Sequence, residues 1–341
     1  MNKSNKDKGH QSKKKCRYPA PKPTRKRIGD RVNEDDIVLK IGTGSLKSGG
    51  MPGGFFWHIY YKDEKAGKIY INYDISSNRA EIQIFINQKS QGKGIRRVAY
   101  KRACELSQYS EIYATMRKSN TASLKAAFAA GFRAIPSDSN KVQMLWSKLS
   151  FSIEAFERLP EKLPRSSYVD FLLLLGNLKP ALRIKISQNE NIVDLSHWCE
   201  TNDFYFLLGK DDYAFIAKNK TIANNIEIID ISTSPHEYEL GKMLGYPDCC
   251  CKKIAKICEE NIDKYEDVFI NEFNVKNSYV LINPKGYKEG YALISHIPCS
   301  PTCEYSLRIA QKSFYIISRY NDRESFKIWV NAWKEYFFLD Y

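Results

Sequence analysis

Ala80-Glu81-Ile82-Gln83-Ile84-Phe85-Ile86, followed shortly by Gln91-Gly92-Lys93-Gly94-Ile95-Arg96, is the most informative stretch of this chain. The apolar run predicts a strand, and apolar residues at helical spacing after the glycines predict a helix that ends near Ser107. A strand, a glycine-bearing turn and a helix in this order suit a phosphate group. Small residues let backbone N–H groups point inward, and the helix adds the positive end of its dipole. The sequence therefore predicts an anion-binding loop, with a surface hairpin turn as the alternative.

A second strand and helix complete the pattern. Residues 111–116 have the composition of a strand, and Asn120 is placed to cap a helix over residues 121–130. Gly131 is placed to end that helix, and Phe132 follows at once. The two halves together predict a mixed α/β unit.

This pairing, Gln-x-x-Gly-x-Arg after a strand and later Asn-x-x-Ser-Leu-x-x-x-Phe-x-x-Gly-Phe, resembles the GNAT superfamily of acyl-coenzyme A-dependent N-acyltransferases over roughly residues 35–148. The resemblance implies that the glycine loop holds the pyrophosphate of acetyl-coenzyme A and that Asn120 lines the pantetheine and thiol end. It also implies that a backbone N–H of the strand before the loop polarises the thioester carbonyl. The residues expected to contact the coenzyme are Ile84, Phe85, Ile86, Gln91, Gly92, Lys93, Gly94, Ile95, Arg96 and Asn120.

The chain departs from the family at two positions. Arg96 replaces the usual last small residue of the loop, where we expect its guanidinium to add a phosphate contact. Ala127 stands where many members place a Tyr that protonates the leaving thiolate; Tyr113 and Ser123 are nearby in sequence but lie off the family pattern. Glu81, at the start of the strand, is the candidate general base, with an exposed strand residue paired to a lysine as the alternative.

The length of 341 residues indicates two domains. Strands are predicted at 36–42, 55–62, 67–74, 80–86, 111–116 and 142–149 in the first, and at 181–186, 203–208, 213–217 and 226–231 in the second. Helical patterns begin near residue 234 and include two long stretches at 304–320 and 323–338. We therefore predict an α/β (α+β) protein: a GNAT-like mixed sheet with helices at 31–150, a linker at 151–166, and a Cys-containing α+β domain at 167–341.

The amino-terminal tail, residues 1–30, is strongly basic. Its first 28 residues hold eleven Lys or Arg and one Asp, so most of the net charge of +14 lies there. With few apolar residues and several prolines, the tail is expected to be disordered. It either contacts nucleic acid or the ribosome through phosphates or only keeps the protein soluble.

The chain shows no apolar run long enough to cross a membrane and no apolar core of a secretory signal. We therefore expect a cytoplasmic protein without membrane contact whose nine cysteines are reduced thiols.

Five cysteines lie near two predicted helix starts. Cys249 to Cys251 open the helix after Pro247, and Cys299 and Cys303 flank another start. Three consecutive helical residues point about 100° apart, so at most two of the first group face one site, and Cys249 and Cys250 are the favoured pair. With His296 as a further ligand, this set predicts zinc or an iron–sulfur cluster. A reactive thiol and plain packing of small apolar side chains are the alternatives.

The segments 239–250 and 296–303 are similar to an uncharacterised prokaryotic family labelled DUF483, a likeness that covers roughly residues 165–341. It supports one cysteine site built from two distant segments and implies no reaction. The sequence thus predicts an acetyl-coenzyme A-dependent transferase acting on an unknown amine, with the C-terminal domain binding the acceptor or a metal. Two alternatives stay open: a degenerate coenzyme-binding module fused to a metal- or thiol-dependent domain, and a nucleic-acid-associated protein.

Overall fold

A computed structural model describes residues 32–137, 139–186, 192–210, 212–232, 236–257, 259–272 and 278–337. The amino-terminal tail, Cys16, Cys258 and the predicted helix start at Ser234 lie outside these residues. Val32–Tyr341 forms one compact unit. None of the helices in the described part of the chain has the length and apolar composition that a membrane crossing requires.

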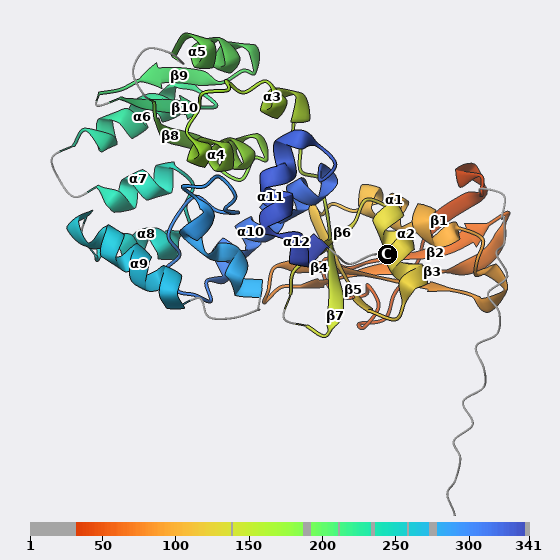
Figure 1. The fold of residues 1–341 in the computed structure, drawn as a ribbon. Coiled ribbons are helices and arrows are strands. Elements are labelled where there is room, and N and C mark those ends of the chain that lie inside the picture. The colour runs from red at the N-terminus through yellow and green to blue at the C-terminus, as the bar shows by residue number, and fades with distance from the viewer. Residues whose placement is uncertain are drawn as a thin grey trace, which may run out of the picture. The chain divides into compact units, whose positions relative to one another are not determined.

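The first half is built on a seven-stranded mixed sheet with the order β1-β2-β3-β4-β5-β7-β6 (Figure 1). All neighbours pair antiparallel except β4 and β5, which run parallel. The strands are β1 (Ile37–Ile41), β2 (Phe55–Tyr61), β3 (Glu64–Asp74), β4 (Arg79–Ile86), β5 (Glu111–Arg117), β6 (Arg133–Ile135) and β7 (Lys141–Ser147). The predicted strands of this half are confirmed, and β6 is an additional short strand.

Two helices, α1 (Ile95–Leu106) and α2 (Thr121–Ala129), cover one face of this sheet. Their buried residues share a core with alternate residues of the strands, among them Ile82 of β4 and Ile112 of β5. Because strand side chains alternate between faces, Tyr113 points to the opposite face. There it packs with Leu145 and with Tyr315 from the C-terminal half.

The second half contains a three-stranded sheet of order β8-β10-β9 and ten helices within the described residues. Its strands are β8 (Ala181–Lys185), β9 (Tyr205–Leu208) and β10 (Tyr213–Ala217). Its helices are α3 (Ile153–Glu157), α4 (Arg165–Leu175), α5 (Ile192–Thr201), α6 (Lys220–Asp230), α7 (Glu237–Met243), α8 (Asp248–Ala255), α9 (Ile262–Glu272), α10 (Glu304–Arg319), α11 (Lys327–Ala332) and α12 (Lys334–Phe337). The predicted fold class, a mixed sheet with helices followed by a second α+β part with a cysteine cluster, is confirmed.

Three details of the second half differ from expectation. Residues 226–231, predicted as a strand, fall at the end of α6, where Asn219 caps the helix and Ile222 and Ile226 recur at helical spacing. The stretch predicted as a linker contains α3, whose Phe156 is buried in the core of this half. The helix predicted at 323–338 is divided into a 3-10 turn, α11 and α12.

Candidate functional site

The glycine loop connects β4 to α1 by a backbone path that favours glycine. Gly92 and Gly94 have φ angles of +76° and +77°, and Gly94 is the N-cap of α1. A side chain at either position would be strained in this left-handed conformation. Gln91 folds the loop back, because its Nε2 donates to the Ile86 carbonyl oxygen at 3.2 Å. The loop therefore leaves its backbone and the first turn of α1 in an arrangement that can bind an anion.

The strand that leads into this loop, β4, separates from its parallel neighbour β5 before the loop begins. They are in register only at Glu81 and Tyr113, whereas β4 pairs with β3 and β5 with β7 along their lengths. A cavity of about 760 Å³ opens where the two strands diverge. It is lined by Glu81, Ile82, Gln83, Ile84, Phe85, Tyr100, Thr115, Met116, Arg117, Asn120, Ser123 and Lys141. The backbone edge of β4 along this cavity is free of strand pairing with β5.

The predicted coenzyme residues divide into those on the cavity and those on the loop. Ile84 and Phe85 line the cavity, whereas the Ile86 carbonyl is engaged by the loop. Asn120 also lines the cavity, and its side-chain oxygen caps α2 by accepting from the Ser123 N–H at 3.3 Å. Lys93 lies beside the ring of Tyr61, with its Nζ 5.6 Å from the ring centroid.

Arg96 is tied to the protein. Its Nη1 donates to Ser123 Oγ at 3.0 Å, and so links the first turn of α1 to α2. Its Nε is buried without a hydrogen-bond partner among the described residues. The residue that departs from the family pattern thus joins the two helices that border the cavity and retains one unused donor.

The candidate acid–base residues occupy different places. Glu81 lines the cavity at the point where the strands part, and it makes no side-chain hydrogen bond or ion pair to another described residue. Tyr113, the register partner of Glu81, lies on the face of the sheet opposite α1 and α2, under the Arg79 guanidinium, and burial raises the pKa of its phenol. Ala127 is fully buried, and Phe128 is half exposed beneath Arg133.

Tyr100 of α1 is a cavity residue that the sequence analysis did not single out. Burial raises the pKa of its hydroxyl, so the group stays protonated at neutral pH. Its position on the buried side of α1, next to Ala99 and Ala103, was visible only as part of an apolar helical face. The signal available in the sequence was the hydroxyl group that Tyr100 adds to this otherwise apolar face.

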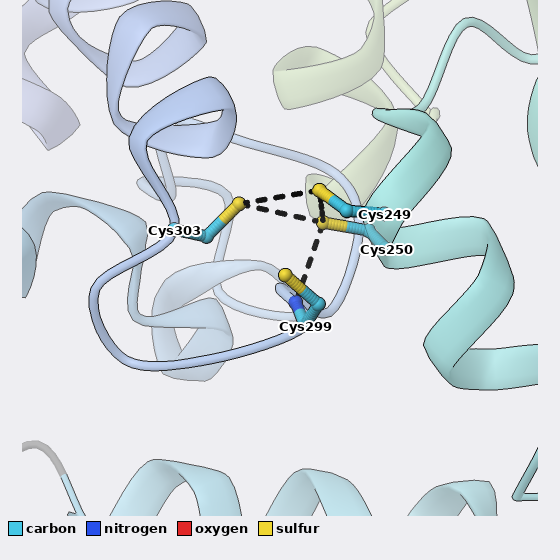
Figure 2. Close-up of side chains that lie close together, drawn as sticks. All are labelled: Cys249, Cys250, Cys299 and Cys303. Atoms are coloured by element: carbon cyan, nitrogen blue, oxygen red, sulfur yellow. Dashed lines mark hydrogen bonds between the residues drawn. The ribbon is translucent and has the colours of Figure 1, made fainter.

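A second candidate site lies in the C-terminal half, where four sulfur atoms gather (Figure 2). The Sγ atoms of Cys249, Cys250, Cys299 and Cys303 all lie within 4.8 Å of one another. Cys250 and Cys303 are buried, and Cys249 and Cys299 are partly exposed. Cys251 points elsewhere, with its Sγ 3.6 Å from the Tyr246 carbonyl oxygen.

Hydrogen bonds to sulfur shape the charge of this cluster. Bonds from Cys250 and Ser306 lower the pKa of Cys303 to about 4, whereas burial and bonds to its neighbours raise the pKa of Cys299 to about 12. The predicted ligand His296 lies outside the sulfur group. Its Nε2 is 2.8 Å from Ser306 Oγ, which is in turn 3.3 Å from Cys303 Sγ. Burial lowers the pKa of His296 to about 3, so its ring is neutral at neutral pH.

Comparison with known proteins gives partial matches to both halves. A family model described as "Protein of unknown function (DUF483)" matches residues 221–328. An uncharacterized protein of Methanocaldococcus jannaschii is 30% identical over 77 residues, which cover 21% of this chain. The match spans 36% of that relative, about a third of its length.

Solved structures with some similarity include acetyltransferases. A spermidine N-acetyltransferase, SpeG from Vibrio cholerae, in complex with CoA and spermine, is 18% identical, with 28% of this chain and 66% of that chain covered and a TM-score of 0.25. The GNAT domain of S. lividans PAT is 12% identical, with 28% and 61% covered and a TM-score of 0.26. A domain from M. jannaschii is 19% identical, with 28% and 67% covered and a TM-score of 0.26. Both resemblances noted in the sequence recur in these comparisons.

Proposed function

We propose that this chain is an N-acyltransferase that moves the acetyl group of acetyl-coenzyme A to an amine in the gap between β4 and β5. One observation carries the proposal. The parallel strands β4 and β5 are in register at one residue pair, Glu81 and Tyr113, and β4 then leads to a loop with two glycines of positive φ. This arrangement joins a free strand edge to an anion-binding helix start. A coenzyme with a diphosphate at one end and an amide-bearing arm at the other requires both features.

The free edge of β4 supplies the contacts for that arm. In a sheet interior, alternate residues between Gln83 and Phe85 would direct their N–H and C=O groups to β5 and the others to β3, but β4 and β5 have already separated there. Amide groups of the pantetheine arm can take the place of the missing strand. A backbone N–H of Ile84 or Phe85 would then stabilise the negative charge that develops on the thioester oxygen.

The reaction needs a base for the amine and an acid for the departing thiolate. Glu81 sits at the mouth of the gap without a side-chain partner among the described residues, and so its carboxylate is free to take a proton from the ammonium group of the acceptor. The amine nitrogen then bonds to the acyl carbon as the carbon–sulfur bond breaks, and the second proton that this nitrogen loses on becoming an amide passes to solvent. Tyr100, protonated and on the same cavity, is placed to donate to the sulfur.

Calorimetric titration with acetyl-coenzyme A tests this proposal. The variant Gly94→Ala puts a side chain at φ +77° in the loop, a strain of about 1–2 kcal/mol that the loop relieves by changing shape. We expect the affinity for coenzyme to fall about tenfold or more, since 1.4 kcal/mol corresponds to a factor of ten. Gly131→Ala is the matched control, because Gly131 has φ +98° outside the loop and a Cβ there meets only Trp146 at 3.4 Å.

The outcomes separate the competing functions. Equal affinity in both glycine variants, or no binding by the native chain, would refute the proposed site. Binding with no release of free coenzyme A across a panel of polyamines, amino acids and peptide amines would leave a coenzyme-binding module without transferase activity.

A further inference from the structure

We propose that Cys249, Cys250, Cys299 and Cys303 bind one tetrahedrally coordinated zinc ion and that this site has no iron–sulfur cluster. The distances between the sulfurs carry this inference. Cys249 Sγ lies 3.9 Å from Cys250 Sγ and 3.8 Å from Cys303 Sγ, and Cys250 and Cys303 are 3.7 Å apart. A zinc–sulfur bond of about 2.3 Å gives a tetrahedron whose edges are about 3.8 Å.

The same distances argue against other uses of four cysteines. An iron–sulfur cluster places several iron and sulfide atoms between its thiolates, which are then held well beyond the 4.8 Å limit seen here. A disulfide needs sulfurs about 2.05 Å apart and joins them in pairs. In this cluster Cys250 has two other sulfurs at nearly equal distance, which is the arrangement around a single central ion.

The surrounding backbone prepares these side chains for a cation. Cys249 and Cys250 lie in the first turn of α8, and Cys303 is the N-cap of α10. Both helix starts favour thiolate, the form that binds metal. The Cys299 N–H donates to Cys250 Sγ at 3.3 Å, and Ser306 Oγ donates to Cys303 Sγ, so part of the excess negative charge of a tetrathiolate site is neutralised.

The site is structural in character. Four protein ligands complete a tetrahedron and leave no open position for a substrate. The ion connects α8 to α10, although their ligands are separated by about fifty residues in sequence. Zinc with four sulfur ligands therefore fastens the loop before α10 to α8.

Elemental analysis of the intact chain, purified without added metal and under nitrogen, tests the proposal. We expect one zinc per chain, without iron and acid-labile sulfide. Cys303→Ser should lose the zinc, whereas Cys251→Ser should keep it. Cys251 is the matched control because it follows Cys250 directly in α8 and its sulfur contacts the Tyr246 carbonyl instead of the cluster. Iron with sulfide in the native chain, or zinc retained by Cys303→Ser, would overturn the proposal.

A second measurement does not depend on the folding of the variants. The native chain is loaded with cobalt in place of zinc, and its absorption spectrum is recorded. Four thiolates in a tetrahedron give intense visible ligand-field bands and strong thiolate-to-cobalt charge transfer. A weak octahedral spectrum would contradict the inference. So would a titration with a thiol reagent that finds these four sulfurs unreactive because they form disulfides. Acetyl-coenzyme A binding is read separately, so failure of either proposal leaves the other standing.

Discussion

Substituting Asp170 by Asn should destabilise the protein strongly, because it leaves a buried lysine without its counter-charge. Lys179 Nζ lies 2.6 Å from Asp170 Oδ1 and 2.9 Å from Ser295 Oγ, and the two charged side chains are only 4% and 2% exposed. Tyr287 donates to the other oxygen of Asp170. Burial alone would lower the pKa of Lys179, but the Asp170 carboxylate and Tyr246 outweigh burial and raise it.

The size of the effect follows from the proton on Lys179. Without Asp170 the folded state is expected to hold a neutral lysine, and at pH 7 deprotonation of a lysine with an ordinary pKa of about 10.4 costs about 4.6 kcal/mol. This deprotonation cost is the upper limit of the effect, and it agrees with the roughly 3–5 kcal/mol seen when one partner of a buried ion pair is removed. We therefore expect Asp170→Asn to lower the free energy of unfolding by about 3–5 kcal/mol at pH 7.

The pH dependence distinguishes this mechanism from simple loss of a hydrogen bond. In the native chain the folded-state pKa of Lys179 is raised, so its contribution is present below about pH 10.4 and is lost only as the pH rises through the folded-state value. In Asp170→Asn, Lys179 is neutral in the folded state and protonated in the unfolded state, so the unfolded state binds one more proton. The deficit should therefore shrink by about 1.4 kcal/mol for each pH unit above 7.

Urea unfolding at pH 7 and pH 9 measures both effects. Asp36→Asn is the control: Asp36 pairs with Lys62 at 3.9 Å on the surface, where loss of the pair costs about 0–1 kcal/mol with no such pH dependence. Replacing the pair together, as Asp170→Asn with Lys179→Met, should recover much of the loss. A deficit below about 1 kcal/mol at pH 7 for Asp170→Asn, or one that does not change between the two pH values, would refute the reasoning.

Three further changes test the proposed acyl-transfer site and the contact between the halves. Glu81→Gln should reduce kcat/KM about 100-fold while calorimetry shows unchanged coenzyme affinity, and a normal rate would exclude Glu81 as the base. Tyr100→Phe should slow turnover while calorimetry shows unchanged coenzyme affinity; an unchanged rate would assign proton donation elsewhere. Tyr315→Phe removes a buried hydroxyl that lies 3.3 Å from the carbonyl oxygens of Gly131 and Ser147, and should cost about 1–1.5 kcal/mol in thermal unfolding. No change in that experiment would indicate that neither bond contributes to stability.

The sheet of the first half was predictable because local signals agree there. Alternating apolar residues, glycine at the loop and Asn120 at a helix start each specify one element. The short strand β6, with three residues, is too brief to give an alternating pattern. The separation of β4 from β5 also has no local signature, since it depends on where α1 and α2 pack against both strands.

The second half shows where local reasoning fails. Residues 226–231 are rich in isoleucine and were assigned to a strand, but the cap at Asn219 lies outside that window and shifts the choice to a helix. The helical spacing of 100° per residue predicted that at most two of the three consecutive cysteines face one site, and the structure places the favoured pair, Cys249 and Cys250, in the sulfur cluster. The position of His296 was not predictable, because its hydrogen bond to Ser306 depends on how α10 packs.

Helix α10 runs from the sulfur cluster to the first half of the chain. It begins at Cys303 in the sulfur cluster, and farther along Arg308 Nη2 donates to the Ser77 carbonyl oxygen at 2.8 Å and Lys312 Nζ lies 2.5 Å from Glu111 Oε1. Ser77 lies in the turn between β3 and β4, and Glu111 is the first residue of β5, so both contacts are to the half that contains the proposed acyl-transfer gap. Removal of the proposed zinc ion should therefore loosen the start of α10 first, while the contacts of Arg308 and Lys312 with the first half hold the middle turns in place.

Hydrogen exchange of the native chain, with and without a zinc chelator, measures this effect along the helix. We expect faster exchange in α8 and in the first turns of α10, a smaller change near Lys312, and no change in β4. Exchange that rises uniformly through α10 and β4 would mean that the metal supports the whole fold. Unchanged exchange in α8 and α10, once loss of zinc has been verified, would show that the sulfur cluster holds its shape by packing alone.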